Sequence, residues 1–219
     1  MTQANTVSSS RNRTLGPKDQ SHVSTADGRL NRAQNRRRRI FRALHDCIIE
    51  TGYSNTTLAH IAKRADMSPS HLLYYFQGKE RILEEYFDNV SQWFLARIAE
   101  ISEEPVEERI FLLSELWFEE SEDAYADIGF MLECFGEAVH DGVMRQTKSQ
   151  FDRSCKESLE LMLSQHSLRD GISPAQAAEI GYALLIGLRN SAYFDNNVTL
   201  SEAANSFLAA IRNLQNTDP

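Results

Sequence analysis

Apolar residues recur along most of this chain at spacings of three and four, which places them on one face of an α-helix. The first such stripe begins near Arg36 and contains Ile40, Phe41, Leu44, Cys47 and Ile48. Gly52 then ends the predicted helix as a C-cap residue does. No stretch alternates apolar and polar residues over the length of a strand, so we expect a fold without a β-sheet.

Two short helices follow the first. Thr56 and Thr57 offer N-caps for a helix that ends near Ala65. Asp66-Met67-Ser68-Pro69 then predicts a turn, because Ser68 is a favourable N-cap and proline is tolerated at the first helical position. The third helix ends before Gln77-Gly78. One longer helix followed by two short ones with a tight turn is typical of a helix-turn-helix, whose last helix enters the major groove of DNA.

The rest of the chain continues the helical pattern. A long helix is predicted over about residues 79–101, and further helices over about 106–122, 126–140, 143–166, 174–193 and 200–214. The sequence therefore predicts an all-α fold of about nine helices. Residues 1–32 are rich in polar residues and nearly lack large apolar ones, which indicates a flexible arm. That arm is either a start-site extension or cloning remnant, or a basic segment that touches DNA.

Charge divides the chain into two unequal parts. Residues 1–81 hold 14 Lys+Arg and 6 Asp+Glu, a net charge of +8, whereas residues 82–219 hold 9 and 25, a net charge of -16, which together give the overall -8. The average hides a basic N-terminal part that suits a polyanionic partner and an acidic remainder that does not. Arg36, Arg37, Arg38 and Arg39 concentrate this charge. They oppose the helix dipole and repel one another, so phosphate neutralisation is one explanation and a solvated helix end is the other.

Cysteine and hydropathy patterns restrict the other classes. Cys47, Cys134 and Cys155 form no CxxC pair, so we expect neither a metal site nor a disulfide framework, and no cofactor is indicated. Free thiols fit a cytoplasmic protein. The longest apolar run covers residues 180–188, far short of the roughly 20 residues that a membrane span requires.

Residues 52–83 resemble the signature of TetR-family transcriptional regulators. The matching positions are Gly52-Tyr53, Thr56-Thr57-Leu58, Ile61-Ala62, Ala65, Ser68, Leu72, Tyr75-Phe76, Lys79 and Ile82-Leu83. Asp66 and Ser70 stand where the family usually carries glycine, and Leu73 stands at a usual tyrosine. Asp tolerates a left-handed backbone better than most residues, so we expect the turn to be kept.

The resemblance implies a helix-turn-helix domain over residues 33–81 and a larger ligand-binding and dimerisation domain over residues 82–219. It also implies a homodimeric regulator, in most cases a repressor, that leaves a near-palindromic double-stranded operator when a small-molecule effector binds. The residues expected to contact DNA are Arg36, Arg37, Arg38, Arg39, Thr57, Lys63, Ser68, Ser70, His71, Tyr74, Tyr75 and Lys79. Thr57 and Lys79 are assigned to phosphates, and the start of the third helix to base edges.

Two further sets of residues are expected in the acidic part. The candidate effector pocket comprises Phe111, Trp117, Phe118, Met131, Phe135, Tyr182 and Arg189. Arg189 is the most informative of these because a buried arginine needs a partner, for which Glu133, Glu137 and an anionic ligand are the candidates. The candidate dimer interface comprises Ile180, Leu184, Leu188, Ala204, Phe207, Leu208 and Ile211.

Two other functions remain as alternatives. A thiol redox sensor on the same scaffold would use Cys134 or Cys155, although cysteines in apolar stripes are usually inert. An enzyme is the other alternative, since acidic, histidine and cysteine residues adjoin one another at 45–47, 133–134 and 140–141. None of these groups has the spacing of a metal site or of a nucleophile elbow, so we expect no catalytic residues.

Overall fold

The computed structural model describes residues 27–121 and 123–216. In these segments the chain forms nine α-helices and one isolated bridge, between Leu168 and Gln215. The helices are α1 (Asp27–Thr51), α2 (Leu58–Arg64), α3 (Pro69–Tyr75), α4 (Lys79–Ile101), α5 (Val106–Trp117), α6 (Ala124–Ala138), α7 (Gly142–Leu163), α8 (Pro174–Phe194) and α9 (Leu200–Leu214). The prediction of an all-α fold is confirmed.

Helix α1 begins earlier than the sequence suggested. Its apolar stripe starts at Ile40, but the helix extends back to Asp27, so residues 27–32 of the predicted arm are helical. Leu30 is the one large apolar residue of this N-terminal extension, so the extension has no apolar stripe that could reveal it. Residues 1–26 of the predicted arm lie outside the described residues.

Side-chain hydrogen bonds fix several helix starts where the sequence placed them. Thr57 caps α2 and Ser68 caps α3, each through its hydroxyl oxygen. Ser173 and Thr199 form capping boxes with Gln176 and Glu202 at the starts of α8 and α9. Such caps satisfy backbone N–H groups that have no partner within the helix, which sets the first residue of each helix.

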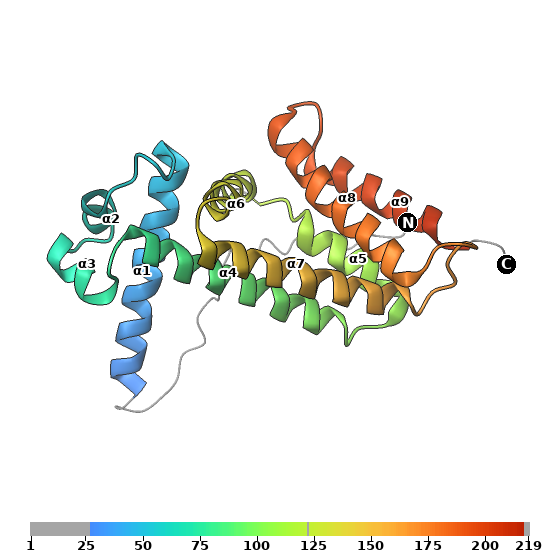
Figure 1. Ribbon diagram of the computed structural model, residues 1–219, viewed down its shortest axis with the longest axis horizontal. Helices are drawn as coiled ribbons and strands as arrows, with labels where there is room; N and C mark the ends of the chain where they lie inside the picture. The colour runs from blue at the N-terminus through green and yellow to red at the C-terminus, as the bar shows by residue number, and fades with distance from the viewer. Residues whose placement is uncertain (1–26, 122, 217–219) are drawn as a thin grey trace, which may run out of the picture.

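The molecule has a small head and a longer body (Figure 1). Helices α1, α2 and α3 lie at one end, α4 runs from them into the body, and α8 and α9 lie at the far end. The two apolar cores meet within α4, because Val90 belongs to the core of the head and Phe94 to that of the body. The packing of the head therefore continues past residue 81, the predicted domain boundary, as far as Val90.

Helix α6 contributes to both cores. Phe130, Cys134 and Ala138 pack in the core of the head, whereas Ile128 packs in that of the body. A displacement of α6 would consequently disturb the packing of both cores.

Candidate DNA-binding surface and ligand cavity

Helix α3 lies at the outer end of the head (Figure 1). Several of its polar and aromatic side chains are exposed. Leu72 is completely buried and anchors the helix, while Ser70 and His71 are exposed. Tyr74 is 83% exposed, which is unusual for a large aromatic side chain. The outer face of α3 is therefore available to base edges, as a recognition helix requires.

The turn before α3 has the conformation expected from the sequence. Asp66 adopts φ 54°, the left-handed region, and is the one non-glycine residue with positive φ in the described chain. Arg39 secures this turn from α1, because its Nη2 donates a hydrogen bond of 2.6 Å to the Ala65 carbonyl oxygen and lies 3.5 Å from Asp66 Oδ2. The expectation that Asp replaces the usual glycine without loss of the turn is confirmed.

The arginine cluster is used differently from what its sequence suggested. Arg36 donates a hydrogen bond of 2.7 Å to the Tyr75 hydroxyl, and Arg37 forms an ion pair with Glu85 of α4. With Arg39 at the turn, three of the four arginines thus hold the head together, whereas Arg38 is exposed. Their partners lie between 26 and 48 residues away in the chain, which is why the sequence showed only a block of charge.

Lys79 also has an internal role. Its ammonium group donates hydrogen bonds of 3.0 Å to the carbonyl oxygens of Tyr53 and Thr56, and it lies 4.2 Å from the centre of the Tyr53 ring. An ammonium group has three donors, and two of them are used here. Lys79 therefore ties the start of α4 to the loop between α1 and α2, and its contact with a phosphate stays a prediction.

The remaining predicted DNA contacts divide into free and engaged groups. Thr57 and Lys63 are exposed on α2. The Ser68 and Thr57 hydroxyls each accept a hydrogen bond of 3.2 Å from a backbone N–H as helix caps. Tyr75 is half-buried, and its hydroxyl is the acceptor from Arg36. Ser70, His71 and Tyr74 therefore remain the most accessible predicted groups on α3.

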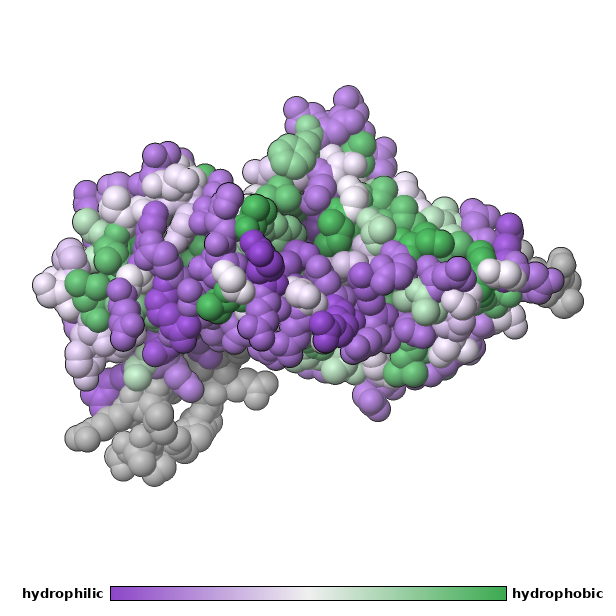
Figure 2. All heavy atoms as spheres, in the orientation of Figure 1, coloured by the Kyte–Doolittle hydropathy of each residue, from purple (hydrophilic) through white to green (hydrophobic). Residues whose placement is uncertain are grey.

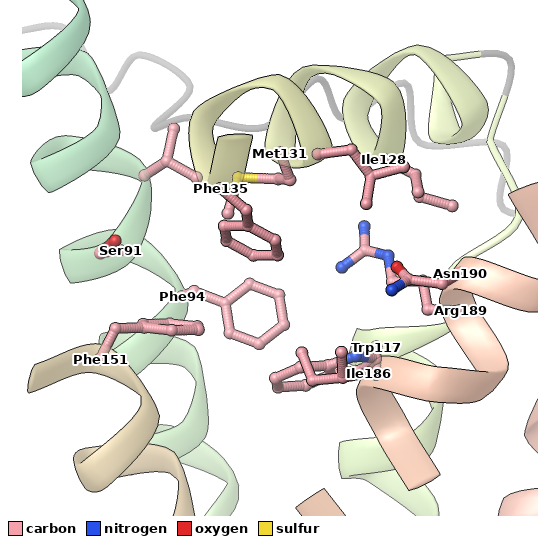
Figure 3. A pocket seen from close by; sticks show the side chains of 12 residues that line it. Ser91, Phe94, Trp117, Ile128, Met131, Phe135, Phe151, Ile186, Arg189 and Asn190 are labelled. Carbon is pink, nitrogen blue, oxygen red and sulfur yellow. The ribbon is translucent and has the colours of Figure 1, made fainter. Parts of the chain in front are cut away.

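A narrow cavity lies in the body below the head (Figure 3). Its volume is about 40 Å³, enough for a few water molecules. Helices α4 to α8 all contribute to its wall. The lining residues are Val90, Ser91, Phe94, Trp117, Ile128, Met131, Leu132, Phe135, Phe151, Ile186, Arg189 and Asn190. The wall is thus largely aromatic and aliphatic, with a few polar groups.

Four of the seven predicted pocket residues line this cavity: Trp117, Met131, Phe135 and Arg189. The other three are corrected. Phe111 is 50% exposed, Phe118 is buried against Phe207 of α9, and Tyr182 is buried with its hydroxyl hydrogen-bonded to Asp152. Residue type suggested all seven, but only helix packing determines which aromatic faces meet. The sequence missed Phe94, whose apolar spacing on α4 indicated nothing beyond core.

Arg189 projects its guanidinium group from α8 into the cavity toward Ile128 and Met131 of α6 (Figure 3). Its Nε is buried and has no hydrogen-bond partner among the described residues. Burial lowers the pKa of this guanidinium to about 10, and the charge of Asp127 acts in the opposite direction. Neither Glu133 nor Glu137 forms an ion pair with it, which corrects the expected partners.

Helix α6 connects the cavity to the head through its other face. Asp127 is buried, and its Oδ1 lies 3.3 Å from His45 Nε2 on α1, although the geometry is not that of an aligned hydrogen bond. Glu133 Oε2 accepts a hydrogen bond of 3.2 Å from the Tyr53 backbone N–H. The Phe130 ring packs 5.0 Å from that of His45. Polar and apolar contacts thus join α6 to α1.

All three cysteines are buried. Burial raises the pKa of the Cys47, Cys134 and Cys155 thiols above the ordinary value of 9.0. Since the thiolate is the reactive form, this environment disfavours oxidation. It argues against a thiol redox sensor.

The predicted dimer residues fall into two groups. Ile180 is 43% exposed, and Leu184, Leu188, Ala204 and Leu208 are partly exposed. Phe207 and Ile211 are instead buried within the protomer, at 0% and 1% exposure, and this corrects their assignment to the interface. Gly181 allows Ile211 and Leu159 to pack closely, because a Cβ there would lie 3.2 Å from Ile211 Cδ1 and 2.8 Å from Leu159 Cδ2. Figure 2 shows apolar side chains gathered over α8, beside a largely hydrophilic α7.

No helix in the described part of the chain has the length and apolar content needed to cross a membrane. Within the same residues, no group of three or more His, Cys, Asp or Glu side chains is arranged to hold a metal ion.

Residues 40–86 match the model of the family described as bacterial regulatory proteins, tetR family. This segment spans the apolar part of α1, the helix-turn-helix and the start of α4, which are the elements that form the head. The head of this chain therefore matches the N-terminal domain of the TetR family.

Two curated relatives are regulators with a helix-turn-helix. The chain is 31% identical over 68 residues to the probable transcriptional regulator YttP of Bacillus subtilis, a match that covers 29% of this chain and about a third (33%) of the length of YttP. It is 24% identical over 153 residues to the regulator BetI of Klebsiella pneumoniae, covering 68% of this chain and 76% of BetI.

Solved structures share the fold of this chain. A transcriptional regulator from Rhodococcus sp. Rha1 superposes with a TM-score of 0.73 at 16% identity, over 84% of this chain and 99% of that one. A regulator from Saccharomonospora viridis, solved in complex with choline, gives a TM-score of 0.70 at 20% identity, over 82% and 96%. The two-part arrangement of head and body is therefore that of known transcriptional regulators.

Proposed function

We propose that this protein is a homodimeric repressor of the TetR family that binds a near-palindromic operator through α3 and leaves it when a small molecule enters the cavity. The observation that carries this proposal is the composition of the cavity wall. Val90 and Phe94 of α4 and Met131 of α6 line the cavity, and these two helices also hold the head.

The exposed face of α3 supports the DNA-binding part. Ser70, His71 and Tyr74 offer hydroxyl, imidazole and aromatic groups, which suit base edges and thymine methyl groups. Lys63 on α2 and Arg38 on α1 are exposed cations that suit phosphates. In this assignment, affinity comes from α1 and α2 and specificity from α3.

The surface of α8 supports the dimer. Ile180, Ala183, Gly187 and Ser191 are exposed and follow helical spacing along one face. Nothing lies within 4 Å of a Cβ built on Gly187, so a partner helix has room to approach closely there. Contact between two copies of this face gives twofold symmetry, and the recognition helices would then address half-sites about 34 Å apart or a near-multiple of that distance.

The small size of the cavity supports a regulation in which a bound effector displaces the helices that form the cavity wall. Drug-sized ligands occupy pockets of roughly 300–1,000 Å³, whereas the volume here is about 40 Å³. A bound effector must therefore move the walls, including α4 and α6. Because α6 contacts α1 through Asp127 and the loop after α1 through Glu133, such a movement changes the position of the head. The effector releases DNA to the extent that it binds the displaced state more tightly.

The charge in the cavity wall bears on whether a ligand such as choline, with which the Saccharomonospora viridis regulator was solved, suits this chain. Choline is a cation, and cations are favoured by aromatic faces without a competing positive charge. Arg189 places a positive charge inside the cavity wall of this chain. We therefore propose that the effector is not a quaternary ammonium compound.

Selection of bound sequences from random double-stranded DNA by the intact protein tests this function. We expect enrichment of a near-palindromic sequence whose binding weakens steeply with salt concentration, since phosphate contacts release counterions. Failure to enrich any sequence at low salt would contradict the proposal. The enriched DNA is then used to screen for molecules that lower its affinity, and a molecule that raises it would indicate an activator instead.

A further inference from the structure

The cavity wall contains unpaired hydrogen-bond donors. Among the described residues, six buried side-chain nitrogen or oxygen atoms lack a partner, and three of them belong to residues that line this cavity. These three are Ser91 Oγ, Trp117 Nε1 and Arg189 Nε. The indole and guanidinium nitrogens can only donate, and the serine hydroxyl can donate as well. Such donors lack an acceptor, which the oxygens of a ligand in the cavity would supply.

Arg189 adds a charge to this set. A guanidinium group stays protonated at neutral pH, so burial does not remove its positive charge. An unpaired buried charge is strongly unfavourable, and a paired one is not. Within the described residues, the buried Nε of Arg189 has no acceptor at the cavity wall, and an anion would supply one beside the charge.

The nearby acidic residue does not neutralise Arg189. Asp127 influences it electrostatically, but no ion pair within 4.0 Å joins them, and Asp127 lies beside His45 instead. Asp127 and Glu119 border a smaller, polar cavity that shares Arg189 and Phe94 with the first. In Figure 3 the guanidinium points into the apolar cavity, which leaves it accessible to a ligand there.

We propose that Arg189 binds the carboxylate of an amphipathic acid whose apolar or aromatic body packs against Phe94, Trp117 and Met131. The inference rests on the proposed function in one respect, namely that this cavity is the effector site. It adds the chemical class of the effector: a monocarboxylate with a hydrocarbon or aromatic body.

Both halves of such a molecule match the wall. A carboxylate accepts two parallel hydrogen bonds from a guanidinium group, an arrangement that a hydroxyl or an amine cannot reproduce. The rings of Phe94 and Trp117 lie 4.8 Å apart in a T-shaped arrangement, and Met131 adds a flexible side chain that adapts to irregular shapes. A strongly hydrated anion without an apolar body would leave this surface uncovered.

The proposal is tested with three compounds that share one apolar body and differ only in the polar group. Isothermal titration calorimetry with the intact protein would compare 4-phenylbutyrate, 4-phenylbutan-1-ol and 4-phenylbutylamine. We expect the acid to bind at least tenfold more tightly than the alcohol, and the amine to be the weakest of the three. Equal affinity for the acid and the alcohol would overturn the proposal, and this comparison uses only the unmodified protein.

Substitutions then assign the preference to its residues. Arg189→Leu should reduce the affinity for the acid at least tenfold and leave the alcohol unchanged, whereas Arg189→Lys should retain part of the preference. Trp117→Phe keeps the ring and removes the donor, and we expect a loss of several-fold for the acid. Arg153→Met removes an exposed arginine of α7 and serves as the matched control. Binding of the acid by Arg189→Leu as tightly as by the wild type would overturn the assignment.

The outcomes separate the two proposals. If the acid is preferred through Arg189 but no operator can be selected, the site assignment stands and the proposed function fails. If an operator is bound but the acid binds no more tightly than the alcohol and the amine, the further inference fails and DNA binding stands. If the acid binds through Arg189 and does not change operator affinity, the site binds the proposed class and the effector role fails.

Discussion

Lys79 and Tyr53 form a compact contact at the base of the head: the lysine ammonium group donates to the Tyr53 carbonyl oxygen and lies over the Tyr53 ring. The same group also donates to the Thr56 carbonyl oxygen. These contacts join the start of α4 to the loop that precedes α2. A residue at a position typical of phosphate binding in the family thus stabilises the domain that presents α3.

Lys79→Met should therefore destabilise the head. We expect the free energy of unfolding to fall by about 1–3 kcal/mol, because two carbonyl oxygens lose a charged donor. Operator affinity should decrease through misplacement of α3, with no change in the slope of log affinity against log salt. Thermal unfolding and binding at several salt concentrations measure both effects. An unchanged melting temperature with a slope reduced by about one would instead indicate a direct phosphate contact.

Tyr74→Ala, unlike Lys79→Met, should weaken operator binding without destabilising the head. Because the side chain is 83% exposed, we expect stability to change by less than about 0.5 kcal/mol. Operator affinity should fall about tenfold or more if the ring contacts the duplex. Tyr125→Ala removes another exposed tyrosine, from α6, and should leave operator affinity unchanged. Equal affinity of wild type and Tyr74→Ala would remove Tyr74 from the interface.

Ile180→Glu should weaken the dimer at least tenfold, since a charge placed on an apolar interface loses its hydration without gaining a partner. Sedimentation equilibrium measures the change. Leu161→Glu, at a residue of α7 that is 59% exposed, is the matched control and should remain dimeric. A wild-type monomer, or a dimer unaffected by Ile180→Glu, would contradict the assignment of the α8 face.

Stability should decline above about pH 9. The Cys134, Cys155 and Tyr182 side chains are buried, and burial raises their pKa values above the ordinary 9.0 for the thiols and 10.0 for the phenol. The folded protein therefore keeps protons that the unfolded chain releases, and rising pH favours unfolding by about 1.4 kcal/mol per pH unit for each such group.

Thermal melts between pH 7 and pH 10.5 test this alkaline loss. Cys134→Ala removes one contributor, so its melting temperature should fall less steeply than that of the wild type over the same interval. A melting temperature that is constant to pH 10.5 would contradict the burial of these protons.

The sequence determined the elements and the type of function. Helical spacing of apolar residues, together with the caps at Ser68 and Thr199, placed most helix ends to within a few residues, whereas the start of α1 lies well before its predicted position. Asp66 is the informative case: its type and position predicted a left-handed turn, and the backbone adopts one. Such features depend on residues close together in the chain, so local physical chemistry decides them.

Tertiary structure decided how individual side chains are used. Arg36, Arg37 and Arg39 find partners across the head, Phe207 and Ile211 turn into the protomer, and Phe94 becomes part of a cavity wall. An amphipathic stripe shows that a face is buried but not against what, since burial within a chain and burial against a partner have the same periodicity. Arg189 is the clearest example. Whether its buried Nε finds a hydrogen-bond partner depends on every helix that packs around it, so no local sequence pattern indicates the outcome.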